Sequence, residues 1–547
     1  MTIRKKITLF GLALIAGSAL QAQPTSSPRQ APRNWPYLDP ARDSVAGISL
    51  DRAYELLKGR TAQPVIVTVL DSGVDVDHED LKDVIWTNPK ESAAPDNGKD
   101  DDKNGYTDDL HGWNFMGAKD GKTYEYDQEE VTQIYAMWRT KYERADRAKL
   151  TPVEQRQFDT YQKAKKGFLA QSVAVRQRRM ALSDSARFFA VMEQMKPLLA
   201  GKPFTAGAIQ QAALPATDSV GLAVRSVLGD IFDERLQSFD RMTMLVKFAF
   251  PRLKDALLKD GDKNYNLDSK QRELVGDDPL NPTETGYGSP KLIIGESEEL
   301  GMHGSHVAGI IGAKRGNGKG MDGVADNARI MTVAVVPSGG DERDKDVANG
   351  IRYAVDNGAK VINMSFGKRL SPYKEQIDAA FKYAEDRDVL IVHASGNNGE
   401  NYDSIPAYPT FKYEDGTMAK NFLTVGNSTF QLNERLAASS SNYGIESVDL
   451  FAPGTDIYAT LPRNNYMNLT GTSMASPCVA GVAALLRGYF PKLTAVQVKD
   501  ILMRSVYKPN LMVRKPGGGS QKVPFSTLSR SGGIVNAYEA VKLAMTM

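Results

Sequence analysis

Residues 470–477 read TGTSMASP, and this stretch places a serine in a setting typical of a nucleophile. Ser473 follows Gly-Thr, precedes small residues, and opens an apolar helix predicted over 473–486. A hydroxyl at a helix N-terminus is exposed where backbone N–H groups point outward. A reactive serine also needs a base, a group that orients the base, and a binder for the oxyanion.

Three other segments could supply these groups. Asp71 ends the apolar run PVIVTVL, and His303 lies in GMHGSHVAGIIGA before a second apolar helix. The chain order Asp, His, Ser is one of the orders in which a catalytic triad occurs. Asn397, in ASGNNG, offers a side-chain amide to an oxyanion. His306, three residues past His303, could instead suggest a metal pair.

The elements that must position these residues follow an alternating pattern. Continuous β-branched apolar runs predict strands buried on both faces, at 64–70, 328–336, 359–367 and 389–396. Helical periodicity predicts helices at 50–58, 346–358 and 373–388. Strands that alternate with helices predict an α/β fold with a parallel sheet. Functional residues are then expected at the carboxyl ends of the strands.

The segments VLDSGV, HGSHVAG and GTSMASP resemble the three active-site motifs of the subtilisin-like serine protease (subtilase) family. The resemblance covers about residues 61–115 and 291–547. It implies a parallel β-sheet sandwiched by helices and a serine endopeptidase that works through an acyl-enzyme. It also implies the triad Asp71, His303 and Ser473, with Asn397 in the oxyanion hole.

The same resemblance implies a substrate-binding surface. An edge strand that pairs with the substrate backbone would be formed by Ser365, Phe366 and Gly367. The opposite wall of the S1 pocket would be formed by Ala394, Ser395 and Gly396, with Ala407 at its base. Two other functions stay open: a latent or inactive member whose insertion binds a partner, and an esterase that uses the same nucleophile.

The interval between Asp71 and His303 is 303 − 71 = 232 residues, which is long for the family. Residues 120–290 explain it, since they hold long charged helical stretches, and Thr151 to Glu154 form a predicted capping box. We therefore expect a mostly helical insertion that restricts access, binds an unknown partner or assists folding. The predicted segments are 1–22 (signal peptide), 23–60 (N-terminal extension), 61–119 with 291–547 (catalytic domain) and 120–290 (insertion).

Clustered oxygen ligands predict structural calcium. Asp100, Asp102, Asn104 and Asp108 have the spacing of a hard-cation loop, although His111 stands where an EF-hand has Glu. The alternative is a solvated acidic loop. A second acidic run offers Asp260, Asp262 and Asn264 as further candidate ligands. The family resemblance implies another candidate pair, Asp80 and Asn317.

Composition narrows the class of protein. The 547 residues are 41% hydrophobic and 24% charged with a net charge of +2, which does not favour nucleic-acid binding. Cys478 is the single cysteine, so no intrachain disulfide can form, and we interpret it as a packing residue rather than a regulatory thiol.

The first residues carry a targeting signal. A basic patch, an apolar run and small residues at Ala19 and Ala22 predict a signal peptide over 1–22, the alternative being an uncleaved anchor. We expect a secreted or periplasmic protein with no stable membrane anchor after signal cleavage. It would act on proteins or peptides.

Overall fold

The computed structural model describes residues 31–91, 95–232, 238–292, 300–405 and 407–547. The predicted signal peptide therefore lies outside the described residues. The chain divides into two compact units, one formed by Arg29–Glu130 with Lys270–Met547 and the other by Val131–Ser269. The domain boundaries at 119/120 and 290/291 stay a prediction.

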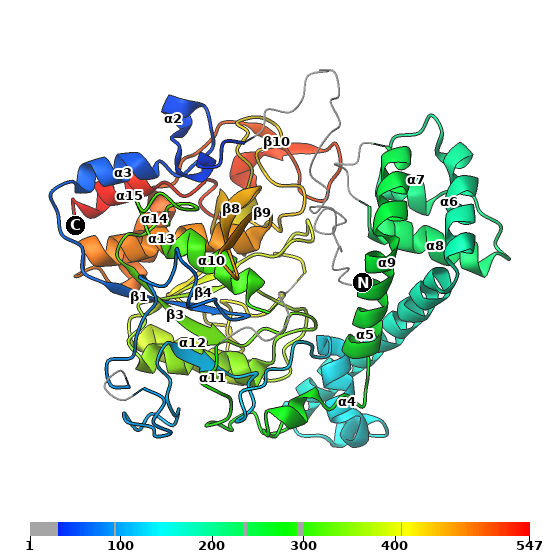
Figure 1. Ribbon diagram of the computed structural model, residues 1–547, viewed down its shortest axis with the longest axis horizontal. Helices are drawn as coiled ribbons and strands as arrows, with labels where there is room; N and C mark the ends of the chain where they lie inside the picture. Colours follow the sequence, from blue (N-terminus) through cyan, green and yellow to red (C-terminus); the bar gives the residue numbers. More distant parts are fainter. Residues whose placement is uncertain (1–30, 92–94, 233–237, 293–299, 406) are drawn as a thin grey trace. The chain divides into compact units, whose positions relative to one another are not determined.

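The larger unit contains a seven-stranded sheet in the order β2-β3-β1-β4-β5-β6-β7, and every pairing in it is parallel (Figure 1). Its strands are β1 (Val65–Asp71), β2 (Gly112–Asn114), β3 (Ala328–Ala334), β4 (Val361–Met364), β5 (Leu390–Ala394), β6 (Phe422–Ser428) and β7 (Leu450–Pro453). Because β1 lies between β3 and β4, its last residue is inside the sheet and not at an edge.

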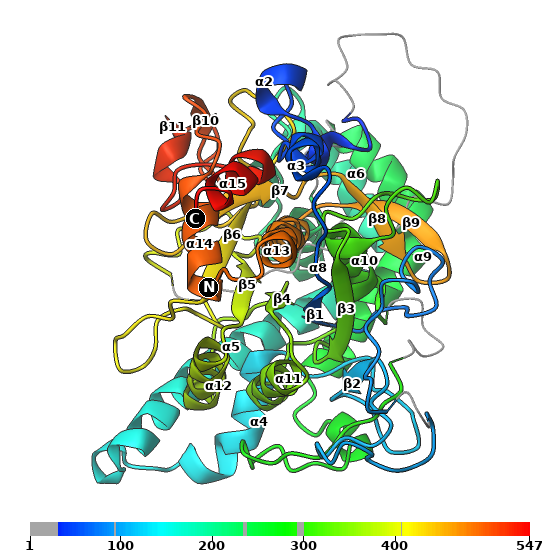
Figure 2. The ribbon, with the colours of Figure 1, turned by 90° about the vertical axis from the view of Figure 1, so that its left-hand side faces the viewer.

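Helices cover both faces of this sheet (Figure 2). The helices α10 (Met302–Gly312) and α13 (Thr472–Tyr489) pack on one face, and α11 (Asp344–Asp356) and α12 (Lys374–Asp386) on the other. The first face is also covered by α3 (Leu50–Leu57), α14 (Ala495–Arg504) and α15 (Ala537–Ala544). Burial on both faces explains the continuous apolar runs, and the predicted α/β fold is confirmed.

Sequence patterns missed three strands and two ribbons. β2 has three residues, too few for a periodicity, while β6 and β7 are flanked by loops rather than by helices. The ribbons are β8 (Ile457–Leu461) with β9 (Asn465–Leu469) and β10 (Met512–Arg514) with β11 (Lys522–Pro524), both antiparallel. Short α2 (Pro40–Asp43) precedes α3.

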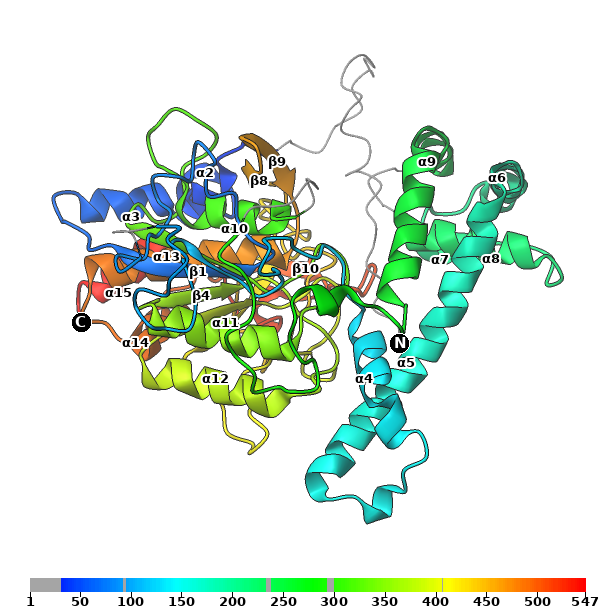
Figure 3. The same ribbon diagram turned by 60° about the horizontal axis from the view of Figure 1, so that its bottom comes forward.

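The smaller unit is helical, and its described residues contain no strand (Figure 3). Its helices are α4 (Glu130–Tyr142, with Glu130 in the larger unit), α5 (Pro152–Ser183), α6 (Ser185–Leu199), α7 (Ala206–Gln210), α8 (Ser219–Asp230) and α9 (Phe239–Asn264). The predicted capping box is present, because the Thr151 hydroxyl accepts from the Glu154 N–H while the Glu154 carboxylate accepts from the Thr151 N–H. Its own apolar core joins α5, α6, α8 and α9.

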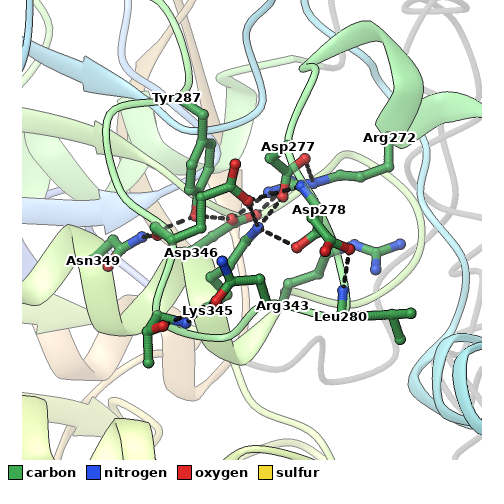
Figure 4. Close-up of polar contacts among 12 residues, drawn as sticks. Arg272, Asp277, Asp278, Leu280, Tyr287, Arg343, Lys345, Asp346 and Asn349 are labelled. Carbon is green, nitrogen blue, oxygen red and sulfur yellow. Dashed lines mark hydrogen bonds and ion pairs between the residues drawn. The ribbon is translucent and has the colours of Figure 1, made fainter.

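A buried ion network joins residues 272–287 to the start of α11 (Figure 4). Arg272 donates to both carboxylate oxygens of Asp346, at 2.7 and 2.6 Å, and to Asp277 at 2.8 Å. The Tyr287 hydroxyl donates to Asp346 at 2.6 Å, and Lys345 forms an ion pair with Asp277. Every charge in this network is paired, so burial leaves no carboxylate uncompensated.

No helix among the described residues combines the length and the apolar character that crossing a bilayer requires.

Candidate active site

Asp71 and His303 meet at the carboxyl end of β1. Asp71 is the last residue of β1, and His303 is the second residue of α10. The imidazole Nδ1 lies 2.8 Å from Asp71 Oδ1, which also accepts from the Ser72 N–H at 2.7 Å. Gly304 allows this approach, since a Cβ there would lie 2.1 Å from the Gly73 carbonyl oxygen. A proton on Nδ1 leaves Nε2 as the free base.

The surroundings set the basicity of His303. Burial alone would lower its pKa, but the Asp71 carboxylate outweighs burial through its charge and its hydrogen bond, so the pKa of His303 is raised. Asp71 is 1% exposed, whereas the His303 side chain is 36% exposed. The pair therefore joins a buried carboxylate to a base that solvent can reach, and general acid–base catalysis needs an accessible base.

Ser473 is the second residue of α13, so its position at a helix start is as predicted. Its hydroxyl donates to the Ser365 carbonyl at 3.1 Å. Polar side chains fasten the helix start to β4, because Ser365 Oγ donates to the Ser473 carbonyl at 3.0 Å and Ser476 donates to Asn363 at 2.7 Å. Asn363 completes this by donating to Ser365 Oγ at 2.9 Å.

Asn397 is exposed and held in one orientation. Its carbonyl oxygen accepts from the Thr472 N–H at 2.9 Å and from the Thr472 hydroxyl at 3.2 Å. The amide NH₂ is therefore turned away from Thr472 and can donate elsewhere. Sequence reasoning missed Thr472, although its place between the two helix-start residues Gly471 and Ser473 could have suggested it.

The predicted substrate-binding residues lie on two neighbouring strands. Ser365, Phe366 and Gly367 follow β4, while Ala394 ends β5 and leads into Ser395 and Gly396. β4 and β5 pair in parallel, so both segments leave the same edge of the sheet. Ala407 is half-buried, and the neighbouring Tyr408 pairs with Lys368. Two arms that leave one edge can flank an extended chain.

Two other histidines, His306 and His393, are buried and have lowered pKa values. His306 Nε2 lies 3.1 Å from the Met467 carbonyl, and burial lowers the pKa of His306 to about 3. His393 Nε2 lies 2.8 Å from the Phe366 carbonyl, and burial lowers its pKa to about 4. His306 is fully buried with its Nε2 at a backbone carbonyl, which suits a packed position. Cys478 is fully buried, and burial raises the pKa of its thiol to about 12, which suits a packing residue.

The structure brings Asp80 and Asn317 together. The Asn317 amide donates to Asp80 Oδ1 at 2.6 Å. The other oxygen, Asp80 Oδ2, is buried without a hydrogen-bond partner. A buried carboxylate oxygen without a partner is costly in free energy, and a cation would compensate it. The free Asp80 oxygen therefore fits a hard cation, whereas the Asn317 amide oxygen already accepts from the Lys319 N–H at 2.9 Å.

The loop at 96–109 adds a residue that sequence reasoning missed. Glu91, Asp100 and Asp102 each place a carboxylate oxygen within 4.8 Å of the others. Glu91 Oε1 accepts from the N–H groups of Asp101 and Asp102, while Glu91 Oε2 is buried without a partner. Glu91 stands outside the ligand spacing of the loop, so no sequence signal pointed to it.

The other predicted ligands of this loop are used locally. Asn104 donates its amide to Asp109 at 3.0 Å and accepts from the Tyr106 N–H. Asp108 accepts from the N–H groups of Asn97 and Gly98. In contrast to these loop residues, Asp260, Asp262 and Asn264 lie within α9. The side chains of Asp260 and Asp262 are outside the described part of the structure.

A parallel sheet that brings an aspartate–histidine pair, a helix-start serine and an amide donor to one end is typical of serine hydrolases. The Peptidase_S8 model, described as the subtilase family, matches residues 290–532. Subtilisin Savinase of Lederbergia lenta is 38% identical over 217 residues, which are 39% of this chain and 74% of that protein. The chain therefore belongs to the subtilase family.

Other relatives match over smaller shares of their length. Thermitase of Thermoactinomyces vulgaris is 40% identical over 184 residues, covering 34% of this chain and 60% of that protein. The cell wall-associated protease of Bacillus subtilis (strain 168) is 42% identical over 203 residues, covering 37% of this chain and 21% of that protein. The matched region thus spans less than two thirds of both relatives.

Proposed function

We propose that this protein is a serine endopeptidase that hydrolyses peptide bonds in proteins or peptides through an acyl-enzyme. The observation that carries the proposal is the 2.8 Å contact between Asp71 and the half-buried His303, at the sheet end where the Ser473 hydroxyl contacts Ser365. Family membership supports the same chemistry.

The Ser365 carbonyl gives the substrate a role in starting the reaction. It accepts from the Ser473 hydroxyl at 3.1 Å. A peptide that pairs with Ser365–Gly367 offers its own N–H to that carbonyl, which releases the hydroxyl to turn toward His303 Nε2. His303 then takes the serine proton while the serine oxygen bonds to the substrate carbonyl carbon.

The remaining steps use groups already oriented. The Asp71 carboxylate stabilises the imidazolium, and the Asn397 amide with the Ser473 N–H binds the oxyanion. His303 gives its proton to the leaving amine as the carbon–nitrogen bond breaks. A water molecule, deprotonated by the same imidazole, then hydrolyses the ester on Ser473 and restores the hydroxyl.

An active-site probe separates this proposal from a latent or inactive protein. A fluorophosphonate reacts only with an activated serine, so we expect labelling of the purified protein and none of Ser473→Ala. Absence of labelling in a protein with native circular dichroism would contradict the proposal. Peptides compared with simple esters that lack an acyl-side N–H then distinguish an endopeptidase from an esterase, because only the peptide offers the N–H that Ser365 accepts.

We also propose that calcium stabilises the larger unit. Two buried oxygens without partners support this, Asp80 Oδ2 beside Asn317 and Glu91 Oε2 beside Asp100 and Asp102. Bound calcium would neutralise the carboxylates and hold the loops. We expect a chelator to lower the midpoint of thermal unfolding, and Glu91→Gln to reduce that effect. An unchanged midpoint in the wild-type protein would contradict this proposal.

The predicted signal peptide supports a proposal of export to a secreted or periplasmic location. N-terminal sequencing of the mature protein tests it, with a new N-terminus at about residue 23 expected.

A further inference from the structure

The loop that carries Asn397 is exposed at its tip. It follows β5, which ends at Ala394, and both Asn397 and Asn398 are exposed. Exposed loops move more than the elements that they connect. An oxyanion donor, however, stabilises charge only when it is held in place before the reaction begins. The fold must therefore restrain this loop from a buried position.

Asn442 contacts the loop on both sides of Asn397. Its amide oxygen accepts from the Asn398 N–H at 3.1 Å and from the Glu400 N–H at 2.9 Å. Its amide nitrogen donates to the Ser395 carbonyl at 2.8 Å. One side chain thus binds the backbone before and after the candidate oxyanion donor.

The backbone of Asn442 adds three contacts to the same cluster. Its N–H donates to the Gly396 carbonyl at 2.9 Å, and its carbonyl accepts from the Ser395 and Ser441 hydroxyls at 3.2 and 2.9 Å. Gly396 permits this approach, because a Cβ there would lie 2.6 Å from the Asn442 amide nitrogen. Asn442 is fully buried, and each of its four polar groups has a partner, as buried polar groups require.

Thr472 holds the loop from the other side. Its hydroxyl accepts from the Gly396 N–H at 3.0 Å, beside its contact with the Asn397 amide oxygen. Thr472 belongs to α13, the helix of Ser473, whereas Asn442 lies in the connection between β6 and β7. The loop is therefore fixed between two elements that are distant in sequence, and the direction of the Asn397 amide depends on both.

We propose that Asn442 is a positioning residue for the oxyanion hole, which holds the loop so that the Asn397 amide faces the developing oxyanion. This inference rests on the proposed peptidase function. Because Asn442 is fully buried, it acts through Asn397 and not by contact with the substrate. Its loss should therefore lower the rate of the chemical step and leave substrate binding nearly unchanged.

A double-mutant cycle tests this role. Cleavage of one peptide is measured for the wild-type protein, for Asn442→Ala, for Asn397→Ala and for the variant with both substitutions. Asn442→Ala alone should lower kcat about tenfold to a hundredfold, less than loss of the donor itself, with KM changed about twofold at most. With Asn397→Ala present no donor is left to position, so adding Asn442→Ala should lower kcat about twofold at most.

Asn421→Ala is the matched control. Asn421 is also a fully buried asparagine whose amide donates to a backbone carbonyl, that of Val389 at 2.8 Å. It precedes β6 at the amino ends of the strands, whereas Asn397 follows the carboxyl end of β5. Asn421→Ala should therefore lower stability but keep kcat per folded molecule, with folded protein measured by circular dichroism.

The loop has a second attachment that does not use the Asn442 side chain. The Tyr443 N–H donates to the Glu400 carbonyl at 3.0 Å, and the Tyr402 N–H donates to the Tyr443 carbonyl at 2.8 Å. The fold can thus survive Asn442→Ala. If that variant does not fold, the isosteric Asn442→Asp replaces it throughout the cycle. It keeps both acceptor contacts and loses the donor, so a fall in kcat of about threefold to tenfold is expected.

The outcomes separate this inference from the function on which it rests. An unchanged kcat in the Asn442 variant, an equal fall with and without Asn397→Ala, or an equal fall in Asn421→Ala would each overturn the positioning role and leave the peptidase function standing. If the wild-type protein cleaves no peptide, the proposed peptidase function is wrong, and this inference is wrong with it.

Discussion

Two carboxylate contacts of similar length, Asp71 with His303 and Asp346 with Arg272, have different surroundings. Asp71 contacts His303 at 2.8 Å, and Asp346 contacts Arg272 at 2.6 and 2.7 Å. In the first pair the base is 36% exposed, and Asp71 Oδ2 is buried without a partner. In the second pair both Asp346 oxygens accept hydrogen bonds from Arg272, and one of them also accepts from the Tyr287 hydroxyl (Figure 4).

The difference separates a pair that can exchange protons from one that only holds the structure together. A base that keeps access to solvent can exchange protons with a substrate. A network in which every group is paired has no spare site and instead fixes the position of α11. The contact distances alone would not have distinguished the two.

The largest expected effect comes from Asp71→Asn. The amide cannot stabilise the imidazolium and favours the wrong tautomer, so we expect kcat to fall about 10⁴-fold. The unfolding midpoint should change little, which calorimetry checks beside the kinetics. If activity and stability fell together, Asp71 would belong with the structural pairs.

The converse test is Arg272→Met. Removing one partner leaves Asp346 and Asp277 buried without their cation, so we expect a loss of about 3–5 kcal/mol in the free energy of unfolding. Activity per folded molecule should stay the same. Arg504→Met removes an exposed pair with Asp500 and should leave denaturant midpoints unchanged. Equal effects in the two variants would contradict the comparison.

Asn397→Ala tests whether an uncharged hydrogen-bond donor contributes to the reaction or to substrate binding. Loss of one oxyanion donor should lower kcat about 10²–10³-fold with little change in KM. Asn398→Ala, at the exposed neighbour, is the matched control and should keep full activity. A rise in KM with constant kcat would show that Asn397 binds the ground state instead.

The smallest expected effect is a shift in the pH dependence of activity. Activity needs neutral His303, and because Asp71 raises the pKa of His303, activity should be lost as pH falls through a value above 6.5. In Asp71→Asn the residual activity should persist to lower pH. The same raised pKa stabilises the fold below about pH 6.5, a contribution lost as pH rises through the folded pKa. A pH–rate profile that does not move between the two proteins would contradict this assignment.

The sequence alone determined the fold class and the candidate catalytic residues. Ser473, His303 and Asp71 stand beside glycines and small residues, and β1, β3, β4 and β5 are continuous apolar runs. Such signals are local, because exposure of a nucleophile and burial on both faces constrain neighbouring residues. The helical character of the insertion was also predictable, from periodicity and from the cap at Thr151.

Only the tertiary structure decided which distant groups meet. Glu91 joins Asp100 and Asp102, Glu130 takes the Arg369 N–H, and Arg272 pairs with Asp346. None of these contacts has a spacing that a sequence could reveal, because each joins separate segments of the chain. Polar groups buried by folding must find partners wherever the packing brings them, and that choice is made in three dimensions.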